Sequence, residues 1–190
     1  MLIYKKTSLR LNIFYVSALW FAFIASAQAG FLITRADGVL LGHNLQLNAD
    51  LDLNLNNDVE EALRNGISLT VVFDASLYRH RRILWDQGLG DWKLERQISF
   101  HALSGQYVVS ALDSEEAENF YSLGDALKYM GTLKEVDLPL TKTATNNGDL
   151  RLNMRAELDI EALPTPLRPV AYASRAWHLN SGWTTWAIHP

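Results

Sequence analysis

The sequence contains no cysteine among its 190 residues. This absence excludes disulfide bonds, thiol catalysis, cysteine-ligated zinc, iron–sulfur clusters and a lipid-bearing cysteine at the start of a mature chain. Proline and glycine are few, at 5 and 11 residues, which excludes collagen-like and low-complexity architectures. The 48% of hydrophobic and 20% of charged residues are typical of a globular domain that can bury a core.

The first 29 residues have the features of a secretory signal peptide. Three basic residues and no acidic one stand in the first ten positions, and a 13-residue apolar stretch occupies positions 13–25. That length suits a signal-peptide core of about 7–15 residues and is short of the ~20 that a membrane-spanning helix needs. Ala27-Gln28-Ala29 then provides a signal peptidase pattern. We expect residues 1–29 to be a signal peptide, or an uncleaved N-terminal anchor, and residues 30–190 to form a single β-rich domain.

The net charge argues against nucleic acid as a partner. Cleavage after Ala29 would change the formal net charge from −4 to −7, because the removed segment carries three basic residues. An acidic domain lacks the basic surface that phosphate contacts need. Export without cysteines favours the periplasm of a Gram-negative bacterium; the alternative is the inner membrane, with the N-terminal segment as anchor and the domain facing the periplasm. We expect membrane contact only through that segment, if it is not cleaved.

Much of the mature chain alternates between apolar and polar residues, which is the period of a strand with one buried and one solvated face. Five segments are predicted as strands: 44–56, 67–75, 92–102, 107–112 and 150–161. Ser104-Gly105 separates the third from the fourth and predicts a hairpin, although Arg96 interrupts the apolar face of the third. One-sided strands of this kind belong to antiparallel sheets.

Two segments predict short helices. Residues 57–65 carry acidic side chains in their first turn, and residues 122–130 open with a Ser122-x-x-Asp125 capping box; a glycine follows each segment. The expected fold is therefore mainly β: an antiparallel β-sandwich, or a small open barrel, with two short helices, preceded by an N-terminal signal helix.

One candidate binding region is the only basic cluster of the mature domain, Arg79-His80-Arg81-Arg82, which Ile83-Leu84-Trp85 follows directly. Its candidate residues are Arg79, Arg81, Arg82 and Trp85. They would contact an anion or an acidic partner, with the indole ring available for stacking. The alternative is a strand end whose charges block pairing at a sheet edge.

A second candidate region lies near the C-terminus, at Arg168 and Trp177. Residues 163–169 contain three of the five prolines, which cannot donate to a sheet, and predict a rigid surface connection. Arg168 is either a structural partner for an acid such as Glu161 or a displayed binding group. Trp177 belongs to three tryptophans in the last fourteen residues, which would form a platform for a sugar or a peptide, or would fix a C-terminal strand to the core.

Patterns that would indicate a metal or a catalytic site are incomplete. Asp50-x-Asp52-x-Asn54 imitates the start of a calcium loop, but Leu55 stands where that loop needs glycine. The five histidines show no metal-binding spacing, and no Gly-rich phosphate loop, Gly-x-Ser-x-Gly or Ser-x-x-Lys motif is present. We expect no metal, no cofactor and no catalytic residue with a local signature. A cleft with His80 or His101 beside a carboxylate would support a hydrolase.

Four stretches together resemble one bacterial family. They are Ala62-Leu63-Arg64-Asn65-Gly66-Ile67-Ser68-Leu69, Tyr121-Ser122-Leu123-Gly124-Asp125-Ala126-Leu127, Leu158-Asp159-Ile160-Glu161-Ala162-Leu163-Pro164-Thr165-Pro166-Leu167-Arg168-Pro169 and Trp177-His178-Leu179-Asn180-Ser181-Gly182-Trp183. The set resembles domain of unknown function 4390, whose members are often labelled "proline-rich signal peptide protein", over nearly the whole mature chain. The resemblance implies export and, because members' genes often lie near a membrane sensor kinase, at most a signalling connection. It carries over no functional residue.

These features favour an exported envelope domain that binds an envelope or inner-membrane protein, or a small ligand, and is not an enzyme. A link to a membrane sensor system rests on the resemblance alone. Two alternatives stay open. One is an envelope hydrolase whose carboxylate–histidine site is assembled from distant segments, and the other is a purely structural assembly component.

Overall fold

The computed structural model describes residues 30–81, 83–112, 117–142 and 149–188. The predicted signal peptide, residues 1–29, lies outside them. The elements are β1 (Gly30–Leu41), β2 (Asn44–Asn54), α2 (Asn57–Arg64), β3 (Leu69–His80), β4 (Gln87–His101), β5 (Gln106–Ala111), β6 (Ala117–Phe120), α3 (Leu123–Met130), β7 (Thr132–Pro139), β8 (Asp149–Leu158), α4 (Arg168–Ala173), the 3₁₀ helix η1 (Arg175–Trp177) and β9 (Thr184–Ile188). No helix in these residues is long and apolar enough to cross a membrane.

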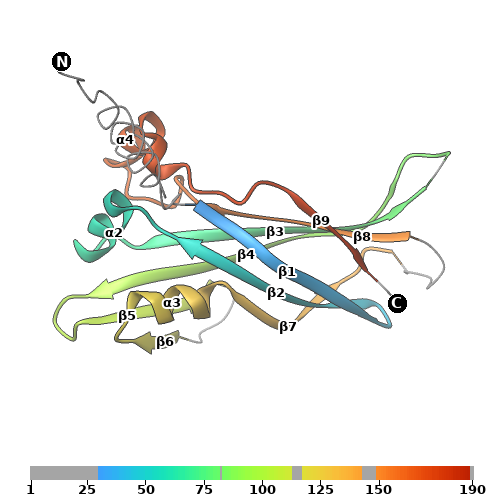
Figure 1. The fold of residues 1–190 in the computed structure, drawn as a ribbon, viewed down its shortest axis with the longest axis horizontal. Coiled ribbons are helices and arrows are strands. Elements are labelled where there is room, and N and C mark those ends of the chain that lie inside the picture. The colour runs from blue at the N-terminus through green and yellow to red at the C-terminus, as the bar shows by residue number, and fades with distance from the viewer. Residues whose placement is uncertain (1–29, 82, 113–116, 143–148, 189–190) are drawn as a thin grey trace, which may run out of the picture.

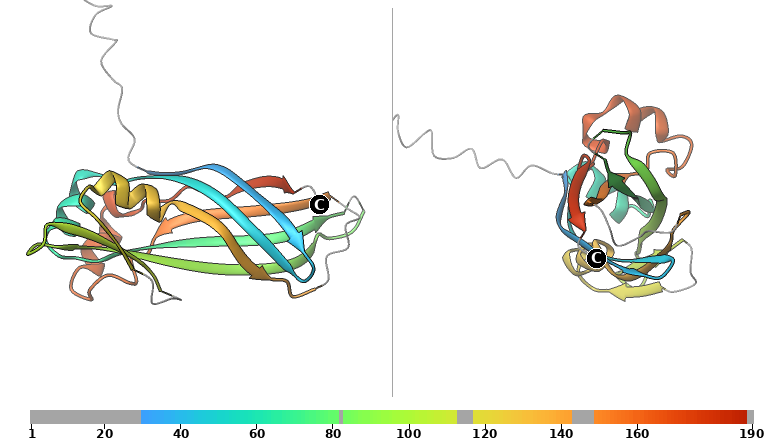
Figure 2. Two further views of the ribbon diagram at one scale, coloured as in Figure 1. Left: turned by 90° about the horizontal axis from the view of Figure 1, so that it is seen from below. Right: turned by 90° about the vertical axis from the view of Figure 1, so that its right-hand side faces the viewer.

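The strands form two antiparallel sheets. The smaller has the strand order β1-β2-β7, and the larger has the order β6-β5-β4-β3-β8-β9. The strands run along the long axis in Figure 1, and Figure 2 shows the sheets curving around a shared interior. The two sheets are linked where the Thr141 amide donates to the Leu89 carbonyl at 2.8 Å. The predicted mainly β, antiparallel fold class is confirmed, and the described strands do not close into a barrel.

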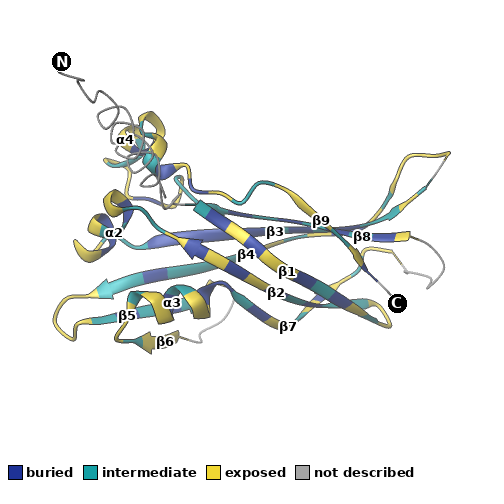
Figure 3. Ribbon diagram, viewed as in Figure 1, coloured by how far each residue is buried: buried dark blue, intermediate teal, exposed yellow. Residues whose placement is uncertain are grey.

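Alternating burial along the strands builds the core between the sheets (Figure 3). Every second residue is buried from Leu45 to Leu53 in β2 and from Leu150 to Leu158 in β8. Burying a large apolar side chain stabilises the fold by about 1.5–3 kcal/mol relative to leaving it in water. The one-sided strands predicted from the sequence are therefore confirmed for these segments.

The helices lie where the sequence predicted them, but the structure adds a third helix and lacks one predicted capping hydrogen bond. The two predicted helices are confirmed as α2 and α3, and a third, α4, begins inside the proline-rich segment 163–169. Pro169 lies in the first turn of α4, where its missing N–H costs no hydrogen bond. The predicted capping bond of Ser122 is wrong, because this side chain makes no cap hydrogen bond. In α2 the Asn56 side chain accepts from the Val59 amide at 3.1 Å.

Arg96 has a structural role that explains its place in the apolar face of β4. Its Nη1 lies 2.9, 3.0 and 2.8 Å from the carbonyl oxygens of Tyr129, Met130 and Thr132, at the C-terminal end of α3. A cation is favoured at this end of a helix because unpaired carbonyls give it a partial negative charge. Arg96 therefore ties α3 to the larger sheet.

The end of α3 also approaches the smaller sheet closely, at Gly131. The Leu51 amide donates to the Gly131 carbonyl at 2.8 Å, and a Cβ atom at Gly131 would lie 2.4 Å from the Leu51 carbonyl oxygen. Because that neighbour is backbone, it cannot rotate away as a side chain would. The helix packs on β2 at this distance only with glycine at position 131.

We predict that Gly131→Ala lowers the free energy of unfolding by about 1–3 kcal/mol, because α3 and β2 would have to move apart. Gly124→Ala, in the same helix, is the control. A Cβ atom there would lie no closer than 3.6 Å to a neighbour, so this change should be neutral or stabilise by up to ~1 kcal/mol. Urea unfolding of both variants is the measurement. If the two variants unfold at the same urea concentration, the close approach of Gly131 to Leu51 does not limit the stability of the fold.

Candidate functional site

The β3–β4 hairpin carries the basic cluster to one end of the molecule. The two strands remain paired up to Arg79 and Gln87. Asp86 closes the loop beyond them, since its Oδ1 accepts from the Arg81 amide at 3.1 Å and lies 3.0 Å from His80 Nδ1. The neck of the turn is therefore formed by residues that the pairing of Arg79 with Gln87 brings together, just beyond a register shift between Leu77 and Tyr78. In Figure 1 this hairpin projects past the ends of the neighbouring strands.

Three consecutive apolar residues, Ile83, Leu84 and Trp85, form the hairpin tip. Their exposed fractions are 95%, 63% and 91%. Leaving this much apolar surface in water is unfavourable, and an exposed apolar patch of this kind commonly marks a contact surface. A Trp side chain exposed to this extent adds nothing to the core.

The two described arginines of the cluster lie just behind the hairpin tip. Arg79 Nη1 lies 3.4 Å from the side-chain oxygen of Gln87, which also accepts a hydrogen bond from Arg81. Gln87 is a neutral amide, so its contacts with Arg79 and Arg81 are hydrogen bonds and not ion pairs. The structure thus brings the candidates Arg79, Arg81 and Trp85 into one hairpin. Arg82 lies outside the described residues.

Arg168 and Trp177, the other candidates, lie near the opposite end of the molecule, in α4 and η1 (Figure 1). Arg168 Nε donates to the Leu163 carbonyl at 2.9 Å, and its Nη1 lies 3.4 Å from a carboxylate oxygen of Glu161. The Tyr172 hydroxyl also donates to Glu161, and this hydrogen bond raises the pKa of Tyr172. Trp177 is buried in the core. Arg168 has the structural contact with Glu161 that the sequence suggested.

We predict that Arg168→Ala lowers the free energy of unfolding by about 1 kcal/mol, because the Leu163 carbonyl loses a charged hydrogen-bond donor at a half-exposed site. Arg175→Ala changes an exposed arginine in the following 3₁₀ helix and should stay within about 0.5 kcal/mol. Thermal and urea unfolding give both values. If Arg168→Ala unfolds like the wild type, the side chain is available for a binding role instead.

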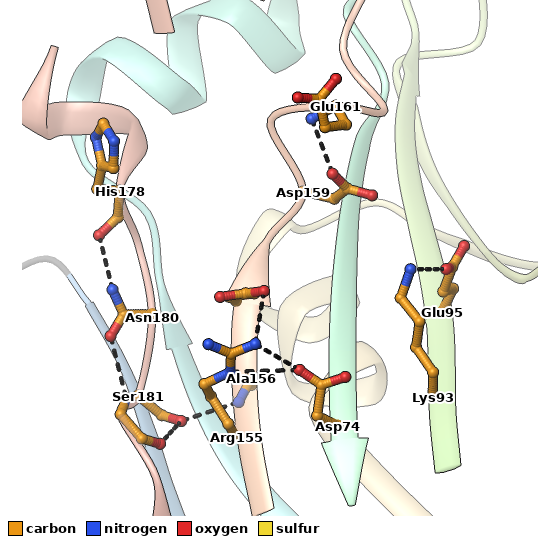
Figure 4. A network of polar contacts seen from close by, with 12 residues as sticks. Asp74, Lys93, Glu95, Arg155, Ala156, Asp159, Glu161, His178, Asn180 and Ser181 are labelled. Carbon is orange, nitrogen blue, oxygen red and sulfur yellow. Dashed lines mark hydrogen bonds and ion pairs between the residues drawn. The ribbon is translucent and has the colours of Figure 1, made fainter. Parts of the chain in front are cut away.

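A row of charged residues crosses the outer face of the larger sheet and was not singled out from the sequence (Figure 4). The register places Asp74 between Lys93 and Arg155. Arg155 Nη2 lies 2.8 Å from Asp74 and 3.0 Å from Glu157, and the hydrogen bond with Asp74 raises the pKa of Arg155. Because each strand contributes one or two of these charges, only the register of the strands reveals the row.

Trp183 lies beside this row. Its ring centroid is 5.0 Å from the Arg155 guanidinium carbon, and the two side chains line an open cavity of about 430 Å³ together with Asp74 and Asp91. The Ser181 hydroxyl accepts from the Ala156 amide at 2.9 Å and fixes this part of the chain to β8. Arg155 is paired here with Asp74 and Glu157, an arrangement well suited to stabilising the sheet surface.

Among the residues that the structure describes, the hydrolase alternative has one matching contact, the His80–Asp86 pair. Its side chains are 48% and 42% exposed, and Asp86 already accepts from the Arg81 amide. Water reaches both groups freely, whereas catalytic pairs normally act in sites that exclude it. His101 is exposed at the end of β4. In the described part of the chain, no three His, Asp or Glu side chains gather closely enough to hold a metal ion.

Comparison with known proteins gives one match. The model of a protein family described as a domain of unknown function (DUF4390) matches residues 28–187. No curated protein and no solved structure matches. The matched range includes the hairpin tip, the proline-rich segment and both sheets except the last residue of β9.

Proposed function

The chain belongs to the DUF4390 family, and we propose that it is an exported, non-enzymatic binding domain of the bacterial envelope that engages its partner through the hairpin tip. The observation that carries the proposal is the exposure of Ile83, Leu84 and Trp85, three neighbouring apolar side chains at the end of the β3–β4 hairpin. Burying such side chains on association is favourable by about 1.5–3 kcal/mol each, and tryptophan is often a dominant contact in interfaces.

The neck of the hairpin supports a binding role as well. Asp86 contacts His80 and the Arg81 amide, so the two sides of the turn are already joined at its base in the absence of a partner. A preordered loop loses less conformational freedom on binding, and more of the contact energy becomes affinity. Under this proposal the His80–Asp86 pair shapes the loop and is not a catalytic dyad.

Export is the second part of the proposal. It is supported by the first 29 residues, with their basic start, short apolar core and Ala27-Gln28-Ala29 pattern. The periplasm of a Gram-negative bacterium is the proposed location, with the inner membrane as the site if the N-terminal segment is retained. The family resemblance adds a connection to a membrane sensor kinase to this proposal.

We predict that intact-mass measurement on the periplasmic fraction gives a mature protein that begins at Gly30. The small-x-small pattern before Gly30 is the physical basis, since signal peptidase accepts small side chains at these positions. A protein of full length that stays with the inner membrane would contradict cleavage and favour the anchored form.

Binding through the hairpin tip is tested by photo-cross-linking in living cells. A benzophenone amino acid at position 84 should give adducts with neighbouring molecules. Leu103 is the matched control, because it is a fully exposed apolar residue in the β4–β5 turn, without a basic cluster beside it. We expect adducts at position 84 and few at position 103. Equal yields at both positions would overturn the assignment of the binding surface.

A further inference from the structure

Resting on the proposed binding role of the hairpin tip, we propose that its partner is the surface of an anionic phospholipid bilayer. The tip would insert Ile83, Leu84 and Trp85 into the interface between headgroups and acyl chains, while Arg79 and Arg81 contact lipid phosphates. This assignment departs from the sequence-based expectation that the membrane is touched only through the N-terminal segment, because exposure of the three apolar residues is visible only in the structure.

The order of residues along the hairpin matches the layers of a bilayer surface. The apolar side chains occupy the extreme end, and the guanidinium groups of Arg79 and Arg81 lie behind them, close to Gln87 at the neck. In membranes tryptophan concentrates at the interface, and basic side chains reach the phosphate level just outside the apolar region. Guanidinium groups also match phosphate oxygens in geometry as well as in charge.

Charge complementarity favours an anionic surface and sets an orientation. Residues 79–86 contain three arginines and one acid, Asp86, whereas the whole chain carries a formal charge of −4 with its basic N-terminal segment included. An anionic surface would therefore attract this hairpin and repel the rest of the mature domain. The domain would stand with its long axis away from the membrane.

The size and shape of the tip favour a bilayer over a protein. A stable protein interface buries about 800 Å² on each partner and surrounds its central residues with further contacts. The tip presents three apolar side chains at the end of a two-stranded projection (Figure 1). Insertion into a fluid interface needs only a few apolar side chains and no complementary pocket.

The position of Gly30 adds a geometric condition. Gly30 pairs with Asn54 at the end where α2 begins, and β3 starts at this same end and reaches the hairpin after twelve residues. A strand of that length spans roughly 40 Å. The tip therefore lies far from Gly30, and a retained N-terminal anchor would direct it away from the membrane that holds the anchor. Binding to that same membrane requires cleavage after Ala29.

The test uses the protein as exported and purified from cells, mixed with vesicles of two compositions. We expect co-sedimentation with phosphatidylglycerol–phosphatidylethanolamine vesicles and at least tenfold weaker binding to phosphatidylcholine vesicles. Leu84→Ser combined with Trp85→Ser should reduce binding tenfold or more, whereas Leu103→Ser should bind like the wild type. Arg79→Gln combined with Arg81→Gln should weaken binding and remove much of its salt dependence. Unchanged circular dichroism and thermal midpoints would show that every variant is folded.

The depth to which Trp85 enters the bilayer distinguishes insertion of the hairpin tip from electrostatic attraction to the bilayer surface. Brominated lipids should quench part of the tryptophan fluorescence in the wild type, and Trp85→Phe should still bind while losing that quenching. The inference is overturned if the wild type does not sediment with anionic vesicles, or if binding is indifferent to the tip substitutions. If, at the same time, position 84 cross-links to a protein, the binding role stands and its partner is that protein. If the protein does not bind vesicles and also forms no adducts at position 84, both proposals are wrong.

Discussion

Strand β3 is paired on both of its edges, to β4 and to β8, and the rest of the larger sheet depends on this register. Its inward side chains supply the core, and its outward Asp74 meets Arg155 from β8. The same pairing continues to Arg79 and Gln87, where it supports the hairpin that carries the exposed tip. One set of backbone hydrogen bonds thus positions a buried layer, an ion-pair row and a projecting loop.

Where the alternation of residues is regular, the sequence was sufficient to predict strands. The segments now seen as β2, β3, β4, β5 and β8, and the helices α2 and α3, were all expected near their observed places. Strand β1 was missed for a physical reason. A register shift between Ile33 and Arg35 moves the buried positions from Ile33 to Ala36, so the period of two is broken in the middle of the strand.

Strand β7 was missed for the same reason. Its pairing with β2 shifts between Leu47 and Ala49, opposite Glu135, which has a φ of 49°. The Glu135 amide donates to the Asn48 side chain at 2.9 Å, so a side-chain bond replaces the regular ladder at this point. A C-terminal strand at the terminal tryptophans was one of two expectations, and β9 agrees with it, but the few apolar residues of β9 give too weak a pattern to predict its bounds. Tertiary pairing with β8, which no local pattern records, forms this strand.

The candidate site shows a different limit of the sequence. Arg79, Arg81 and Trp85 were found because they are neighbours in the chain, and the structure keeps them in one hairpin. An apolar run such as Ile83-Leu84-Trp85 would ordinarily be expected inside a fold, since large apolar side chains are usually buried. Its exposure follows from the turn, because Asp86 closes the neck and leaves the three residues beyond the end of the sheet. A sequence pattern shows which residues are polar or apolar. Whether an apolar side chain is exposed depends on where the paired strands end.

The separation of core and tip along one hairpin also determines what changes at the tip can do. Leu77 in β3 is fully buried, whereas Trp85, beyond the end of the same strand, is 91% exposed. Substitutions beyond the neck are therefore expected to leave the packing between the sheets intact. Arg168 and Trp177 have the opposite character, since both are held against the body of the domain. The sequence suggested two regions for binding, and of these the β3–β4 hairpin exposes apolar side chains at its tip, whereas Trp177 is buried. A contact at the hairpin tip would not disturb the packing of the core.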